Sequence, residues 1–203
     1  NDPVNWDNGF PSAAGDIANL NTDLQGSETI YLRQDISLGV LNIGDAAGAG
    51  NNYQFLIANY PGAAGPPVIP PDPAYTLTFD NGVSAAQINL GLTGTTSNYI
   101  TTPTALNSDL AIDMGATASL NASNYQRLQF TGASLTIGSH NVSVTGGYSL
   151  LGNPGTTYTQ LVIGPATDLI GTGTITINGE TRLEISGTAV ELLATAAAAE
   201  STY

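Results

Sequence analysis

The chain has 203 residues, of which 41% are hydrophobic and 9% are charged, and its formal net charge at pH 7 is −13. This length and hydrophobic share suit one substantial domain with a buried core and exclude a highly charged disordered chain. The acidic surface excludes nucleic acid and membrane insertion as modes of interaction, and the absence of cysteine excludes disulfides, thiolate nucleophiles and cysteine-bound metals.

Residues 1–35 precede the first regular strand pattern, and we predict that they form an N-terminal cap region. From residue 36 onward, short runs alternate an aliphatic residue with a small polar one and end at Gly, Asn or Asp. This period-2 pattern is typical of half-buried strands joined by tight turns, and it predicts an all-β chain. The runs lie at residues 36–44, 75–82, 86–92, 108–115, 126–132, 134–146, 159–164 and 173–187.

Two segments interrupt the strand pattern. Residues 60–75 are rich in proline, which cannot donate a hydrogen bond to a strand ladder, so we predict a loop inserted between strands. The Ala-rich residues 189–203 favour a helix over most of their length and are predicted to form a short C-terminal helix or a tail. The runs on both sides of the proline-rich loop resemble parts of one core, which predicts a single β-solenoid domain over residues 1–203.

The spacing of the runs fits two all-β architectures, a β-solenoid and a β-sandwich. The runs recur at irregular intervals, which a solenoid tolerates because each coil needs only inward aliphatic residues at matching heights. Small outward residues and few aromatic ones favour the solenoid, and the sandwich is the alternative. At about 20 residues and about 4.8 Å per coil, the chain would form roughly ten coils and a rod about 50 Å long.

Two N-terminal segments resemble the opening of bacterial secreted proteins with autotransporter-associated β-strand repeats: NWDNGFPSAAGDIANLNTDL (5–24) and ISLGVLNIGDAAG (36–48). Two further segments are similar to the repeat itself: TALNSDLAIDMGATASLNAS (104–123) and GTGTITINGETRLEISG (171–187). The resemblance implies a secreted or cell-surface, extracellular stalk with the fold of a right-handed parallel β-helix. It carries over no catalytic residues.

Few side chains are candidates for catalysis or metal binding. His140 is the only histidine, and no Ser and Asp near it in the sequence form a triad pattern, so we interpret it as a turn or surface residue. Asp45 and Asp80 lie in loops where oxygen ligands for calcium are able to converge. Neither fits an EF-hand or a nonapeptide calcium repeat, and we interpret both as turn caps.

Two pairs of acids have an even spacing that places each pair on one face of its strand: Asp109 with Asp113, and Glu180 with Glu184. Paired carboxylates hydrolyse glycosidic bonds when their separation suits, and some parallel β-helices cleave polysaccharides. Such sites usually surround the acids with basic and aromatic groups, whereas this chain has three Arg and one Trp. We therefore interpret both pairs as solvated strand faces and predict no enzyme activity and no cofactor.

Aromatic residues and sequons supply the remaining candidates. Trp6 is a candidate for assembly or adhesion by stacking on sugar rings, and its place near the chain start favours a plug for the open end of a solenoid core. The aromatic residues that flank the proline-rich loop are candidates for an assembly or adhesion patch that stacks on sugar rings; they are Tyr53, Tyr60 and Tyr75. Asn121 and Asn141 each begin an Asn-X-Ser sequon and are candidates for N-glycosylation.

A solenoid exposes unpaired backbone groups at both ends, which must be capped or used. Stacking the last coil of one subunit on the first coil of the next satisfies both ends and generates a filament. We therefore predict an extracellular structural protein, a β-solenoid subunit or stalk module whose partners are copies of itself or adjoining surface-protein segments. The alternatives are a monomeric adhesin or carbohydrate-binding module for surface glycans and, third, a polysaccharide-degrading β-helix enzyme.

Overall fold

The structure, a computed structural model, describes residues 11–20, 26–44, 54–61, 74–90, 97–115, 127–146, 159–178 and 181–186. These ranges form seventeen β-strands and no helix, so the prediction of an all-β chain is confirmed for the described part. No helix in this part is long and apolar enough to cross a membrane. The Ala-rich residues 189–203 lie outside the described ranges.

The strands form three sheets, which we name A, B and C. Sheet A consists of β1 (Ile17–Leu20), β4 (Val40–Ile43), β7 (Ala86–Leu90), β10 (Leu110–Asp113), β13 (Val142–Thr145) and β16 (Ile175–Ile177). Sheet B consists of β2 (Glu28–Leu32), β5 (Phe55–Asn59), β8 (Ser97–Ile100), β11 (Arg127–Phe130), β14 (Thr159–Ile163) and β17 (Thr181–Ile185). Sheet C consists of β3 (Ile36–Leu38), β6 (Leu77–Phe79), β9 (Thr104–Leu106), β12 (Ser134–Gly138) and β15 (Asp168–Gly171).

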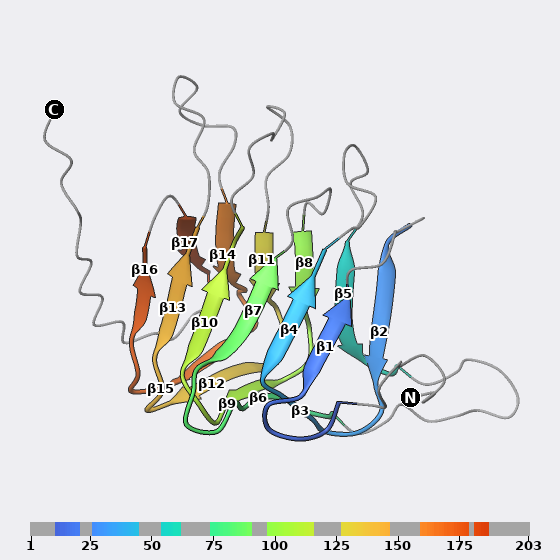
Figure 1. Cartoon of the computed structure of the whole chain (residues 1–203). Helices are drawn as coiled ribbons and strands as arrows, with labels where there is room; N and C mark the ends of the chain where they lie inside the picture. The colour runs from blue at the N-terminus through green and yellow to red at the C-terminus, as the bar shows by residue number, and fades with distance from the viewer. Residues whose placement is uncertain are drawn as a thin grey trace, which may run out of the picture.

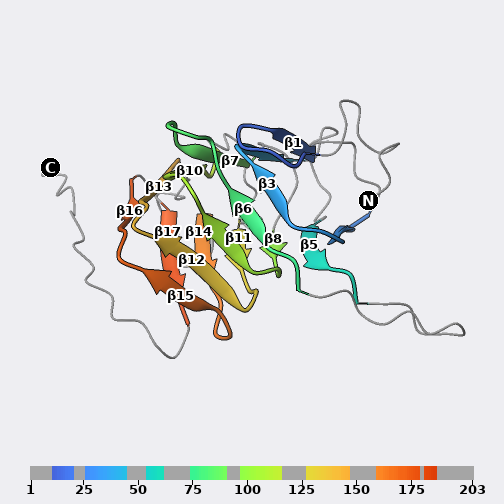
Figure 2. The ribbon, with the colours of Figure 1, turned by 90° about the horizontal axis from the view of Figure 1, so that it is seen from below.

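The chain visits the three sheets in turn, and each strand pairs with the strands three places before and after it. Figure 1 shows sheet A in front, sheet B behind it and sheet C below, and Figure 2 shows sheet C from below with its strands side by side. All strand pairs among the described residues are parallel, whereas a β-sandwich is built from antiparallel pairs. The prediction of a parallel β-helix is confirmed, and its right-handed sense stays a prediction.

The coils are longer and fewer than the sequence pattern predicted. In sheet A, the number of positions between paired residues of successive coils gives the coil length. It ranges from 23 positions, between Ile17 and Val40, to 47 positions, between Val40 and Gln87. The sheets contain six, six and five described strands, so the prediction of ten coils of 20 residues was wrong. The corners between the strands contain residues that belong to no strand. A coil length of about 20 residues does not allow for these corner residues. The distance from β1 to β16 is about 24 Å at the usual strand spacing.

Alternation along each strand directs one set of side chains into a core that runs along the helix axis. Most of the core residues are buried aliphatic side chains, and all but Val162 belong to one cluster. In sheet B the inward residues stack in register, coil upon coil, as the column Ile30, Ile57, Ile100, Phe130, Ile163 and Ile185. This column is filled by apolar side chains alone, each packed on the side chain of the next coil.

The proline-rich segment lies between β5 and β6, at the corner that joins sheet B to sheet C. Residues 62–73 are outside the described ranges, but Ile57 and Phe79 on its two sides belong to the same core cluster. The segment therefore connects neighbouring strands of one β-helix. Within the predicted cap region of residues 1–35, β1 and β2 are strands of the first coil.

We predict that Ile88→Ala lowers the free energy of unfolding by about 2–5 kcal/mol, because it leaves a cavity in the middle of the stack. Ile88 is 0% exposed, whereas Val83, in the turn after β6, is 107% exposed and supplies the control. Val83→Ala should change this free energy by less than about 0.5 kcal/mol. Urea denaturation followed by circular dichroism measures both, and equal losses would contradict the described core.

Candidate functional site

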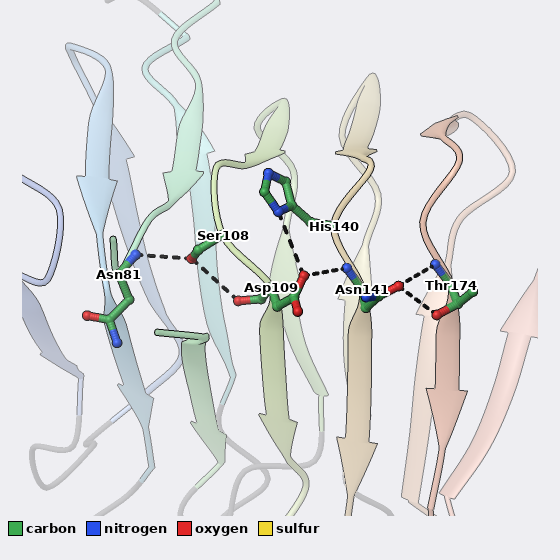
Figure 3. Close-up of polar contacts among 6 residues, drawn as sticks. All are labelled: Asn81, Ser108, Asp109, His140, Asn141 and Thr174. Carbon is green, nitrogen blue, oxygen red and sulfur yellow. Dashed lines mark hydrogen bonds and ion pairs between the residues drawn. The ribbon is translucent and has the colours of Figure 1, made fainter. Parts of the chain in front are cut away.

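A chain of polar contacts runs along the turns that join sheet C to sheet A, at residues 80–85, 107–109, 139–141 and 172–174, which we name the C–A corner (Figure 3). The Asn81 N–H donates to Ser108 Oγ at 3.1 Å, and the Asn141 N–H donates to Asp109 Oδ1 at 2.8 Å. Thr174 donates both its N–H, at 3.2 Å, and its hydroxyl, at 2.8 Å, to Asn141 Oδ1. Each turn thus holds the turn of the next coil in place.

The C–A corner brings together a serine, an aspartate and the histidine. His140 Nδ1 lies 3.7 Å from Asp109 Oδ1, and both side chains are partly exposed. The hydroxyl of Ser108 is bonded elsewhere, because it accepts from Asn81 N–H and donates to the Asp109 carbonyl at 3.4 Å. Ser108 is also only 4% exposed. A catalytic triad requires the serine hydroxyl to be bonded to the histidine, so this group has the residues of a triad without its geometry.

The acid pairs are placed as parts of turns and strand ends. Asp113 Oδ1 accepts from the Gly115 N–H at 2.9 Å, while Asp109 Oδ1 accepts from the next turn. The two acids are four residues apart along an extended strand, about 13 Å, which exceeds the roughly 5–9.5 Å that glycosidic hydrolysis uses. Glu184 accepts a hydrogen bond from Gln160 Nε2 and lies 4.0 Å from Arg182, and Glu180 lies outside the described ranges.

Asp80, one of the two calcium candidates, caps a turn. Its Oδ1 accepts from the Gly82 N–H at 2.9 Å, and its Oδ2 accepts from Asn107 Nδ2 at 3.5 Å. Gly82 has a φ of +62°, a conformation that glycine adopts without strain. In the described ranges no three His, Asp or Glu side chains gather as a metal site. Asp45 lies outside these ranges.

Tyr60 belongs to a surface group that the sequence pattern did not reveal. Its ring meets the ring of Tyr31 edge to face, with centroids 5.6 Å apart, and the guanidinium carbon of Arg33 lies 3.7 Å from its centroid. We name these three residues the Tyr31 cluster. Tyr31 is on β2 and Tyr60 directly follows β5, so the parallel pairing of these strands brings them together from different coils. No local pattern in the sequence predicts that pairing.

The other predicted aromatic candidates are not part of this cluster. Tyr75 packs against the core, its N–H donates to Asn59 Oδ1 at 3.0 Å, and its carbonyl accepts from the Thr102 hydroxyl. These contacts hold Tyr75 in its coil, and its role in assembly or adhesion stays a prediction. Trp6 and Tyr53 lie outside the described ranges.

The two sequon asparagines differ in what the structure says of them. Asn141 is exposed at the C–A corner, and its side-chain carbonyl accepts both hydrogen bonds from Thr174. This contact gives Asn141 a role in stacking the turns, and its glycosylation stays a prediction. Asn121 lies outside the described ranges.

A second polar ladder runs along the outer face of sheet A. Asn42 Nδ2 donates to Asn19 Oδ1 at 2.7 Å, and Asn89 Nδ2 donates to Asn42 Oδ1 at 2.8 Å. The strand register continues this column to Asp113 and Thr145. Asparagine ladders of this kind stabilise stacked parallel strands in register. The sequence shows the asparagines, but only the register reveals that they are aligned.

Within the described ranges, no further strand pairs with either end of the β-helix. Among the described strands, β1, β2 and β3 pair only with the second coil, and β15, β16 and β17 pair on one side only. Three of the four exposed large hydrophobic side chains of the described residues lie on these edge strands: Ile17 at 57%, Tyr31 at 41% and Ile170 at 49%. Some inward residues of the end strands are only partly buried: Leu20, Ile30, Leu169, Ile175, Ile177, Leu183 and Ile185. Other inward residues of the first coil are at most 5% exposed: Ala18, Leu32, Ile36 and Leu38.

None of the family models, curated proteins or solved structures compared with the chain matches it. The functional interpretation therefore starts from the chemistry of the described residues. In these residues the polar groups at the C–A corner and on sheet A hold one coil to the next. The open ends and the Tyr31 cluster are the surfaces that the stacking of the coils does not account for.

We predict that Gly173→Ala lowers the free energy of unfolding by about 1–3 kcal/mol, because the added methyl group forces two turns of the C–A corner apart. A Cβ atom at Gly173 would lie 1.7 Å from the His140 carbonyl oxygen, whereas one at Gly26 meets nothing within 4 Å. Gly26→Ala is the matched control and should leave the stability unchanged or slightly raised. Thermal unfolding of both variants measures the difference, which should vanish if the turns are not in contact.

Proposed function

We propose that this chain is an extracellular structural protein, a β-helix subunit or stalk module that assembles end to end into fibres or matrix. The observation that carries the proposal is the state of the two ends. Among the described residues, each end has edge strands that pair on one side only, at least one exposed apolar side chain on its outer face, and some inward residues that are only partly buried. Soluble proteins normally cover or charge such edges, because they template pairing with another chain.

The geometry of the ends supports assembly of one copy on the next. All strands of one sheet run in the same direction, so the last strand of one copy is able to continue as a parallel neighbour of the first strand of another. Such a contact joins two different surfaces and does not close on itself, which generates a filament. It would bury the partly exposed inward residues of both ends and satisfy their backbone groups.

The net charge works against this assembly. Each copy carries a formal charge of −13, and copies of like charge repel. Salt screens this repulsion while leaving apolar burial intact or stronger, so the assembly should depend on ionic strength.

The location outside the cell is supported by the resemblance to secreted proteins with autotransporter-associated repeats. The segment 171–187, which is similar to the repeat, supplies β16 and β17 of the last coil. A wall of stacked coils without cysteine needs no particular redox environment to fold.

The Tyr31 cluster favours a second candidate function, adhesion to glycans. Exposed aromatic rings bury the apolar faces of sugars, and Tyr31 is 41% exposed. In this cluster Arg33 covers one face of Tyr60, which leaves Tyr31 as the ring that a sugar would contact.

For the structural function, we predict that the protein forms end-to-end oligomers that lengthen with protein concentration and with salt. Raising NaCl from about 0.01 M to about 0.15 M shortens the Debye length from about 30 Å to about 8 Å and weakens the repulsion between copies. Sedimentation velocity gives the size distribution, and negative-stain electron microscopy shows whether the particles are filamentous. A protein that stays monomeric at high concentration and high salt would contradict the proposal.

For adhesion, a glycan array probed with the wild-type protein is the test. A structural module should bind no glycan with appreciable affinity, because the cluster then serves contacts between proteins. If a glycan is bound, Tyr31→Ala should abolish the signal and Val83→Ala, a change at another exposed position, should preserve it. Binding that survives Tyr31→Ala would exclude the cluster as the adhesive surface.

A further inference from the structure

Resting on the proposed end-to-end assembly, we infer that the junction between copies continues the register of sheet A. In this junction β16 of one copy pairs in parallel with β1 of the next, so that Thr176 lies opposite Ile17 and Asn178 lies opposite Asn19. The asparagine ladder then runs from one copy into the next. The occupant of each open end is a second copy of this chain.

The column of outward-facing side chains on sheet A has a polar composition that supports this junction. The paired strands place Asn19, Asn42, Asn89, Asp113 and Thr145 at one register position in successive coils. The sixth position is Asn178, because β16 pairs Ile177 with Val144 and the Asn178 N–H donates to the Val144 carbonyl at 2.7 Å. The column therefore has an exposed asparagine at both of its ends.

The hydrogen bonds of the asparagine ladder all run in one direction, which also supports the junction. Within the ladder, each side-chain amide donates to the asparagine one coil earlier: Asn89 to Asn42, and Asn42 to Asn19. Asn19 accepts from Asn42 through its Oδ1, and the described residues contain no earlier coil to which its amide could donate in the same way. In the proposed junction this amide donates to Asn178 of the preceding copy. The new bond repeats those inside the molecule in both partner type and direction.

The register of sheet B can be continued from one copy to the next in the same way as that of sheet A. Continuing its register sets Ile185 of one copy opposite Ile30 of the next, and both side chains are partly exposed members of one apolar column. The step also sets Glu28 of the next copy opposite Leu183, and the desolvation of this carboxylate against an apolar side chain opposes the contact. Sheet C has one strand fewer, so one strand position is left between β15 and β3 of the next copy.

The absence of cysteine makes this register testable by disulfide formation, since every cross-link must come from introduced residues. Parallel neighbours lie about 4.8 Å apart, within the span of a disulfide, whereas residues two positions out of register lie about 8 Å apart, beyond it. The probe pairs are Ile17→Cys with Thr176→Cys, and Asn19→Cys with Asn178→Cys. The diagonal controls are Ile17→Cys with Asn178→Cys, and Asn19→Cys with Thr176→Cys.

Under mild oxidation, both register pairs should convert the monomer band of a non-reducing gel into a ladder of oligomers that reductant reverses. The diagonal pairs should remain largely monomeric in the gel. Since the four cysteines are the same in both sets, the loss of an asparagine cannot account for the contrast. A variant with a single cysteine should give no linked species. A linked dimer of Ile17→Cys alone, or of Thr176→Cys alone, would mean that like ends meet, and it would overturn the inference.

The failure of this inference is distinguishable from the failure of the proposed function. If the wild-type protein forms filaments and the diagonal pairs link in place of the register pairs, the register is wrong and the structural function stands. Filaments without any linked pair would place the junction elsewhere and also overturn the inference. A protein that is monomeric in sedimentation and links in no variant would overturn both.

Discussion

Parallel pairing of backbone between successive coils is the interaction on which the rest of the structure depends. It makes every strand a template for the strand three places later, and it aligns like side chains in columns through the molecule. An apolar column such as the one from Ile30 to Ile185 fills the core, and a polar column such as the one from Asn19 to Asn89 adds bonds on the outside. The register thus determines both stability and surface chemistry.

The same pairing explains why groups that look chemical in the sequence are structural in the fold. Asp109 and His140 come together because their turns are stacked, and the carboxylate holds the backbone of the next turn. Ser108 and Asp80 are likewise bonded to neighbouring turns, through the Asn81 N–H and Asn107 Nδ2. Among the described residues, these hydrogen bonds hold successive turns together.

What the pairing leaves unsatisfied lies at the two ends, because a column in the middle of the stack has neighbours on both sides and an end has one. This is why partly buried aliphatic residues of the core, such as Leu20 and Ile185, lie on the first and last coils. The function that we propose uses these ends, and the asparagine column provides a register for them. Charge repulsion between acidic copies opposes the contact.

The all-β class and the turn-capping role of Asp80 followed from the sequence alone, since alternation and turn chemistry are local properties. The sequence favoured a β-solenoid but left a β-sandwich open, because both architectures suit the same strand spacing. It did not determine the length of a coil, because residues at the corners leave no periodic mark and Val40 pairs with a residue 47 positions away. Only the tertiary structure placed Tyr31 beside Tyr60 and Asn42 beside Asn19. Those contacts depend on which strands are neighbours, and in a parallel β-helix neighbours are set by the whole circuit of the chain.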